Sequence, residues 1–217
     1  MKTARGFTLV ELLVVFAIIV TITSVVLTSQ SAFNKTLILA NTAYDVALSL
    51  RSAATYGLGG HAINMMPTGY GMHFELSTPG SFTLFADTYP APSALSVCHS
   101  VDDPSTLDAQ PGNCSYESGQ DLMVTTYTLG NNITVGDFCA FASGAWSCAY
   151  AQGGGLTALD IVFARPDADP FMSVNRAYSA LSPVTNACLT ISSPLGGERY
   201  VAVSSTGRIT ANATSCP

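Results

Sequence analysis

The first feature of this sequence is a long stretch that lacks both glycine and proline. The chain holds 18 Gly and 11 Pro, yet neither occurs from Phe7 to Tyr56. Because these residues are the strongest helix interrupters, their absence predicts one helix over the whole stretch, roughly 75 Å long at 1.5 Å per residue. Charge is also scarce there, since Glu11 is the only charged residue between Phe7 and Asn34.

Positive charge is scarce in the chain as a whole. Eight Lys and Arg face 14 Asp and Glu, which gives a net charge of −6. Without Lys2 and Arg5 six basic residues remain, so the side-chain charge falls to −8. An acidic surface opposes sequence-independent attraction to nucleic acid phosphates. Composition therefore argues against a nucleic acid partner.

The sequence also lacks the patterns of a metal or catalytic site. It has no C-x-x-C pair and only three histidines, which argues against structural zinc. None of His61, His73 and His99 forms a motif with a Ser or Asp at a spacing typical of a catalytic site. Acidic pairs such as Asp102-Asp103 are interpreted as solvated loops rather than calcium ligands. The expectation is a protein without enzyme activity, metal or cofactor.

Two familiar kinds of segment explain the N-terminus only in part. A secretory signal peptide has an apolar region of about 7–15 residues and a small-residue cleavage site. Here the apolar run Leu12–Leu27 is longer, and no A-x-A site follows it. A plain transmembrane anchor fits the length, since about 20 residues span the hydrocarbon. It leaves Glu11 unexplained, because a carboxylate inside a membrane costs a few kcal/mol.

A third interpretation explains leader, junction and carboxylate together. The stretch ARGFTLVE at Ala4–Glu11 resembles the processing site of type IV prepilins and pseudopilins. In that family a membrane peptidase cuts after the glycine and methylates the new N-terminus. The resemblance implies cleavage after Gly6, methylation of Phe7 and a role for Glu11 in filament assembly.

Glu11 needs a partner if it lies in hydrocarbon. We expect none within a helical turn or two of it in this sequence. A cationic N-terminus on a neighbouring subunit would supply one and would fix the axial stagger of packed helices. The alternative is a Glu11 that lies near the interface and is solvated by lipid headgroups.

The charge pattern also predicts the topology. Basic residues precede the apolar helix and are few after it, which places the N-terminus in the cytoplasm. The predicted division is a leader at residues 1–6, a transmembrane helix segment at 7–28 and an extracytoplasmic domain at 29–217. The protein would be a single-pass protein of the cytoplasmic membrane with its C-terminal domain outside.

Six cysteines follow the anchor and none lies in it. An even set in an exported domain indicates disulfides. Six cysteines allow 15 connectivities, and pairing of sequence neighbours is favoured here. The expected pairs are Cys98–Cys114, Cys139–Cys148 and Cys188–Cys216.

Beyond the helix the apolar pattern changes to a period of two. From Leu37 onward the helix has one apolar face of mostly small residues, expected to lie against a sheet. The predicted fold is α+β, with one long helix to about residue 56 packed on an antiparallel β-sheet, which is the architecture of pilins. Strands are predicted at Tyr70–Leu76, Ser81–Thr88, Leu122–Leu129, Ile133–Phe141, Thr157–Ala164, Ala187–Ser192, Arg199–Ser204 and Ile209–Ala211.

A finer resemblance extends over three later stretches. YDVALSLRSAATYG at Tyr44–Gly57, LDIVFARP at Leu159–Pro166 and RYVAVSSTGRIT at Arg199–Thr210 look like the H-type minor pseudopilins of type II secretion, the GspH/FimT-like type. The resemblance implies a structural minor subunit of a type IV pilus or a secretion pseudopilus. Its partners would be other pilin or pseudopilin subunits, the prepilin peptidase and the inner-membrane assembly platform.

Two alternatives to that role stay open. FimT-like relatives in competence systems contact DNA through a basic C-terminal motif, which Gly207-Arg208 resembles. Here Ile209-Thr210 follows without a second Arg, although Arg199 and Arg208 could lie near each other on the final hairpin. The other alternative is a simple membrane-anchored extracytoplasmic binding domain.

Overall fold

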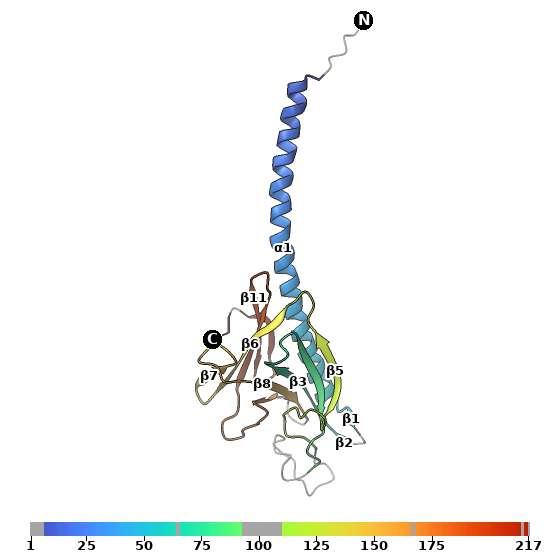
Figure 1. The fold of residues 1–217 in the computed structure, drawn as a ribbon. Coiled ribbons are helices and arrows are strands. Elements are labelled where there is room, and N and C mark those ends of the chain that lie inside the picture. The colour runs from blue at the N-terminus through green and yellow to red at the C-terminus, as the bar shows by residue number, and fades with distance from the viewer. Residues whose placement is uncertain (1–6, 64–65, 93–109, 166–167, 214, 217) are drawn as a thin grey trace. The chain divides into compact units, whose positions relative to one another are not determined.

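The protein has an α+β fold with one long helix and antiparallel sheets (Figure 1). The computed structural model describes residues 7–63, 66–92, 110–165, 168–213 and 215–216, without the side chains of residues 28–33 and 66–67. Its contacts divide the chain into two units, residues 1–38 and residues 39–217.

Helix α1 runs from Leu9 to Leu58, within two residues of the predicted bounds at both ends. Its end is a glycine-rich turn, in which Gly60 adopts the left-handed conformation with φ of 69°. The Gly59 N–H donates to the Thr55 carbonyl at 2.9 Å and so satisfies one of the last helical acceptors. The absence of glycine and proline therefore predicted both the length and the end of this helix.

Within the described ranges, the strands after α1 form two five-stranded sheets and one small two-stranded sheet. All neighbouring strands pair antiparallel, in the orders β5-β4-β3-β8-β9, β12-β11-β10-β6-β7 and β1-β2. The bounds are β1 Ala62–Ile63, β2 Met66–Pro67, β3 Gly69–Glu75, β4 Ser81–Asp87, β5 Leu122–Thr128, β6 Thr134–Ala142, β7 Ala145–Cys148, β8 Ala158–Phe163, β9 Phe171–Val174, β10 Asn186–Ser192, β11 Glu198–Ser204 and β12 Ile209–Ala213.

The prediction of a single sheet was wrong. After β5 the chain turns through Asn131 and Asn132, both left-handed with φ of 57° and 55°, and enters the other sheet as β6. Side chains of period two reveal that a strand has a buried face, but they do not say which strand lies beside it. The eight predicted strands are all present, and β1, β2, β7 and β9 were missed because they have only two to four residues.

The main core lies between the later turns of α1 and both large sheets. The helix contributes side chains that are at most 2 % exposed: Leu39, Ala43, Val46, Ala47, Leu50 and Ala53. They share one apolar cluster with Phe74, Leu84 and Ile161 from one sheet, and with Phe138, Leu189 and Val201 from the other. Four of the helical residues are Ala or Val, which allows close approach of the backbones. The amphipathic pattern from Leu37 onward thus predicted the buried face of the helix.

In the sheet β5-β4-β3-β8-β9, called the first sheet from here on, the central strands β3 and β8 are buried on both faces, whereas the edge strand β5 is largely exposed. Met72 and Phe74 of β3 contact the main core. On the opposite face, Phe85 and Val162 pack with Cys114 and with the partly buried Tyr116. The segment from Gln110 to Asp121 therefore covers the outer face of this sheet. Burial on both faces explains why β8, ALDIVF in the sequence, is an almost continuous apolar run.

The structure contains two disulfides whose partners are both described, Cys139–Cys148 and Cys188–Cys216. They are the pairs that sequence order predicted. Cys114 is disulfide-bonded as well. Its predicted partner, Cys98, lies outside the described residues, so that pairing stays a prediction.

Candidate functional site

The N-terminus of helix α1 is capped by reciprocal hydrogen bonds between Thr8 and Glu11. The Thr8 backbone N–H donates to Glu11 Oε2 at 3.1 Å, and the Thr8 hydroxyl donates to the same oxygen at 3.0 Å. In return the Glu11 N–H donates to Thr8 Oγ1 at 3.2 Å. This is the capping-box arrangement, in which an N-cap Thr and a Glu three residues later satisfy each other's free N–H groups.

This geometry corrects the expectation that Glu11 has no partner within a helical turn. Thr8 is that partner, but it offers hydrogen bonds and no positive charge. The donating N–H belongs to the peptide bond between Phe7 and Thr8, so the capping box survives a cut after Gly6. Gly6 itself lies outside the described residues, and Phe7 is 83 % exposed.

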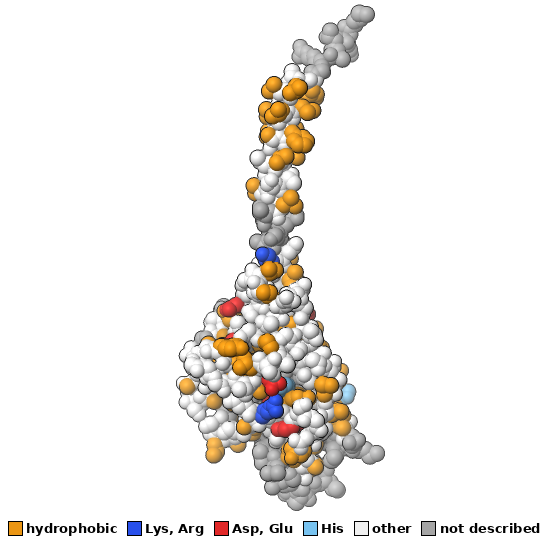
Figure 2. All heavy atoms as spheres, viewed as in Figure 1, with side chains coloured by type: hydrophobic (Ala, Val, Ile, Leu, Met, Phe, Trp, Pro, Cys, Tyr) orange, Lys and Arg blue, Asp and Glu red, His pale blue; other side chains and the backbone are white. Residues whose placement is uncertain are grey.

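The turns of α1 that follow Glu11 present an apolar surface on every side. Leu9–Leu27 is long and apolar enough to cross a membrane, and none of it is buried within the protein. Figure 2 shows hydrophobic side chains along this part of the helix. Thr21, Thr23 and Ser24 donate their hydroxyls to carbonyls three or four residues earlier, which satisfies them without water. The segment fits a membrane anchor.

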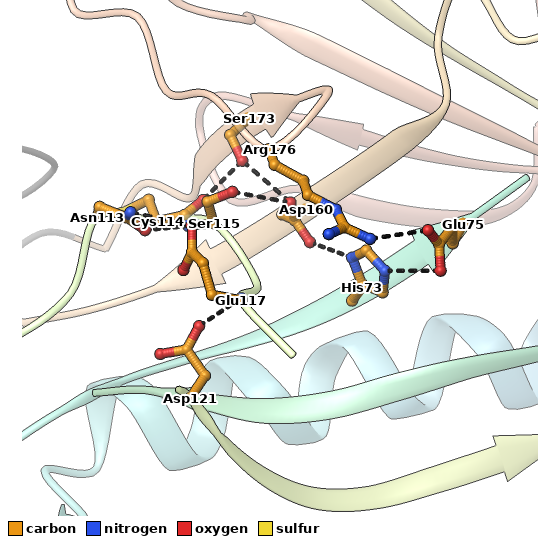
Figure 3. A network of polar contacts seen from close by, with 10 residues as sticks. All are labelled: His73, Glu75, Asn113, Cys114, Ser115, Glu117, Asp121, Asp160, Ser173 and Arg176. Carbon is orange, nitrogen blue, oxygen red and sulfur yellow. Dashed lines mark hydrogen bonds and ion pairs between the residues drawn. The ribbon is translucent and has the colours of Figure 1, made fainter. Parts of the chain in front are cut away.

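A second polar cluster lies on the outer face of the first sheet (Figure 3). His73 of β3 and Asp160 of β8 occupy paired positions, and a hydrogen bond of 2.6 Å joins His73 Nδ1 to Asp160 Oδ1. His73 is 5 % exposed and Asp160 is fully buried. No motif in the sequence predicted this cluster. Its only signal was an acid inside the apolar strand LDIVF, since a buried charge requires a partner.

The cluster contains Ser, His and Asp in an order that does not match a catalytic triad. In a triad the histidine lies between the hydroxyl and the carboxylate and takes the proton of the hydroxyl. Here the Ser115 and Ser173 hydroxyls both hydrogen-bond Asp160 Oδ2, at 3.5 and 3.3 Å. Ser173 Oγ also donates to the Cys114 carbonyl at 2.7 Å. The arrangement fits a structural clamp better than a nucleophile with its base.

Two further carboxylates fasten the segment from Gln110 to Asp121 onto the sheet. The buried Asp87 accepts the N–H of Cys114 at 2.7 Å and that of Asn113 at 3.2 Å. Asp121 accepts the N–H groups of Thr88, Tyr89 and Glu117 at 2.7 to 3.0 Å. Burial raises the pKa of Asp87 well above its usual value, and it raises the pKa values of Asp121 and Asp160 too.

Glu117 lies beside these carboxylates, and its pKa is raised into the neutral range. Burial, opposed by a hydrogen bond from the Asn113 amide and reinforced by Asp121, raises the pKa of Glu117 to about 7. The folded protein therefore holds a proton that the unfolded chain releases near pH 4.5. A group with a raised acidic pKa stabilises the fold at low pH, and that contribution is lost as pH rises to about 7.

Glu117→Gln should make stability less dependent on pH. We expect the free energies of unfolding of variant and parent to be nearly equal at pH 4.5. At pH 8 the variant should be more stable by about 1–2 kcal/mol, after allowance for the solvent exposure of the group. Urea unfolding at several pH values measures this. Glu198→Gln, at an exposed position, is the control without such a trend, and a Glu117→Gln difference that is constant with pH would contradict the assignment.

One cluster has residue types that can bind a metal, but its cysteines form a disulfide and its carboxylate accepts backbone hydrogen bonds. Asp137, Cys139 and Cys148 offer atoms within 4.8 Å of one another. The two cysteines form a disulfide and cannot act as thiolate ligands. Asp137 accepts four backbone N–H groups at 2.9 to 3.0 Å, one from Phe138 and three from residues 149–151. This carboxylate holds the loop after β7 in place.

The two arginines considered for DNA contact are not brought together. Arg199 lies near the start of β11, whereas Arg208 follows its end, where the Ser204 N–H donates to the Arg208 carbonyl at 3.0 Å. Five residues of extended strand separate Arg199 from Ser204, about 17 Å at 3.4 Å per residue. The expectation that they could be neighbours on the hairpin was wrong, because one sits at each end of the strand.

Comparison with known proteins adds one finding. A family model described as the prokaryotic N-terminal methylation motif matches residues 1–27. No curated protein and no solved structure matches the chain. The matched residues include the junction Gly6-Phe7, the capping box and the exposed apolar turns. The chain therefore carries the N-terminus of a type IV pilin-like precursor.

Proposed function

We propose that this protein is a minor subunit of a type IV pilus or type II secretion pseudopilus, of the GspH/FimT-like type. It is cut after Gly6, methylated at Phe7 and assembled through its N-terminal helix, without catalysis or a cofactor. The observation that carries this proposal is the methylation motif at residues 1–27, which includes the apolar helical segment Leu9–Leu27 with its one carboxylate, Glu11, near the start.

The later part of the helix supports a scaffold role for the globular unit. Six of its side chains are buried between the two large sheets, as expected of the pilin architecture. The domain is thereby built directly on the element that would pack in a filament. The precursor would lie in the cytoplasmic membrane with its N-terminus inside, and would pass to an extracytoplasmic filament through the peptidase and the assembly platform.

The alternative of a DNA-binding competence pilin has less support. The two arginines lie at opposite ends of β11, and the net charge of the chain is −6. Affinity for phosphates grows with the number of cations that contact them, and two arginines separated by the length of β11 form no patch. If the chain is not cut after Gly6, the hypothesis that remains is a simple membrane-anchored extracytoplasmic domain.

Processing is tested by the intact mass of the protein recovered from membranes with and without prepilin peptidase. We expect a peptidase-dependent product that lacks residues 1–6 and carries one added methyl group. Gly6→Leu should leave the chain uncut, because the junction no longer fits the peptidase. Ala4→Leu, two residues upstream, is the matched control and should be processed. A chain that stays intact, or is cut elsewhere, with peptidase present would refute the proposal.

A further inference from the structure

A pocket of about 430 Å³ lies on the second sheet. Its volume is within the usual range of small-molecule sites, about 300–1,000 Å³. Asn186, Cys188, Ala202 and Ser204 line it, together with the core residues Ala187 and Val203. The first four alternate along β10 and β11 with core residues such as Leu189 and Val201. Because successive side chains of a strand point to opposite faces, the pocket lies on the face turned away from the core.

Strand pairing brings the key side chains of the pocket into one row. Trp146 of β7 pairs with Phe141 of β6, which pairs with Asn186 of β10. Asn186 in turn pairs with Ser204 of β11, whose N–H bonds the carbonyl of Arg208. Trp146 also packs on Phe141, with ring centroids 5.3 Å apart. Residues from four strands and a turn thus converge at one end of the sheet.

The Cys188–Cys216 disulfide completes the pocket. Cys188 is 2 % exposed and lies in β10, and its bond holds Cys216, which follows β12, against the sheet. Ser215 and Cys216 both line the pocket. The covalent bond therefore fixes one wall of the pocket.

The lining groups combine one cation, one aromatic ring and several neutral polar groups. Arg208 is exposed, and within the described ranges no Asp or Glu forms an ion pair with it. A guanidinium presents a planar fork of donors that matches a carboxylate. The face of an indole ring is electron-rich and attracts C–H groups. The Asn186 amide and the Ser204, Thr210 and Ser215 hydroxyls can donate or accept hydrogen bonds.

We propose that this pocket binds a hexuronate, the acidic sugar unit of a polysaccharide. Arg208 pairs with the carboxylate of the sugar, the pyranose ring packs on Trp146, and the amide and hydroxyls contact the ring hydroxyls. A single cation on an acidic chain suits a ligand with one charge per unit and disfavours a polyphosphate, whose binding requires several cations. The inference is independent of the proposed filament role.

The test uses the full-length protein in detergent and a matched pair of ligands. Galacturonate trisaccharide carries the carboxylates, and its methyl ester has the same rings without the charge. Trp146 is the only tryptophan of the chain, so intrinsic fluorescence reports on this pocket directly. We expect a saturable change with the acid form, confirmed by calorimetry, and binding at least tenfold weaker with the ester.

Two arginine variants separate the pocket from general charge. Arg208→Gln should weaken binding of the acid form at least tenfold and leave binding of the ester unchanged. Arg199→Gln, on the same hairpin but outside the pocket, should bind as the parent does. The proposal is overturned if neither method detects saturable binding at millimolar ligand, or if Arg208→Gln binds the acid form normally. It is equally overturned if a single-stranded oligonucleotide binds more tightly than the trisaccharide.

Discussion

Gly57→Ala should lower the free energy of unfolding of the globular unit by about 3 kcal/mol. A Cβ atom built on Gly57 would lie 2.0 Å from the Phe163 carbonyl oxygen and 2.7 Å from the carbonyl carbon. Both are backbone atoms of β8, a strand buried over its whole length. The contact can be relieved only by moving the end of α1 away from the sheet or by distorting the strand.

The helix propensity of alanine does not compensate for this clash. Alanine is favoured over glycine by about 1 kcal/mol inside a helix, which is smaller than the cost of forcing apart two packed backbones. For a domain of this size a loss of 3 kcal/mol corresponds to a fall in melting temperature of about 6–12 °C. Thermal unfolding followed by circular dichroism measures it in the full-length protein.

Gly80→Ala is the matched control for this substitution. Gly80 lies in the turn between β3 and β4, and its Cβ would meet no atom within 4 Å. We expect its stability to change by less than about 0.5 kcal/mol. If Gly57→Ala unfolded at the same temperature as Gly80→Ala, the close approach of α1 and β8 would be wrong.

The same contact shows what the sequence could predict about the fold. The lack of glycine and proline up to Tyr56 predicts a helix that ends near residue 56, and α1 ends at Leu58, one residue past Gly57. Gly57 also lets the backbone of β8 pack closely against the helix. This contact involves Phe163, which lies more than a hundred residues later in the sequence. Local patterns specify each element and its buried face, whereas the pairing of distant strands depends on turns such as Asn131-Asn132 and on packing that has no local signature.

The polar sites divide in the same way. Glu11 stands out in the sequence because it is the only charge in a long apolar stretch. His73 and Asp160 lie 87 positions apart and appear unrelated until the register of β3 and β8 pairs them. Arg199 and Arg208 appear close in the sequence but lie at opposite ends of a strand. In both cases the separation in the sequence does not predict the separation in space. An extended strand moves residues that are near in sequence apart, whereas strand pairing brings remote residues together.

Glu11→Gln is expected to reduce incorporation into filaments at least tenfold, while processing and membrane insertion stay normal. Glutamine can still accept the Thr8 N–H, so the capping box persists, but the negative charge is lost. Removing one partner of a desolvated ion pair typically costs about 3–5 kcal/mol. If Glu11 pairs with the N-terminus of a neighbouring subunit, loss of the charge alone should prevent assembly. The measurement is the amount of protein in sheared filaments relative to membranes, with intact mass to verify processing.

Thr8→Val provides the complementary variant, because it removes the hydroxyl of the capping box and keeps the charge of Glu11. The backbone N–H of residue 8 still donates to the carboxylate, and loss of an N-cap hydroxyl costs only about 1 kcal/mol. We expect near-normal incorporation. The opposite pattern, with Glu11→Gln assembling and Thr8→Val failing, would assign Glu11 to capping the helix. Normal assembly of both variants would favour a carboxylate solvated by headgroups, since neither its charge nor its cap would then matter to the filament.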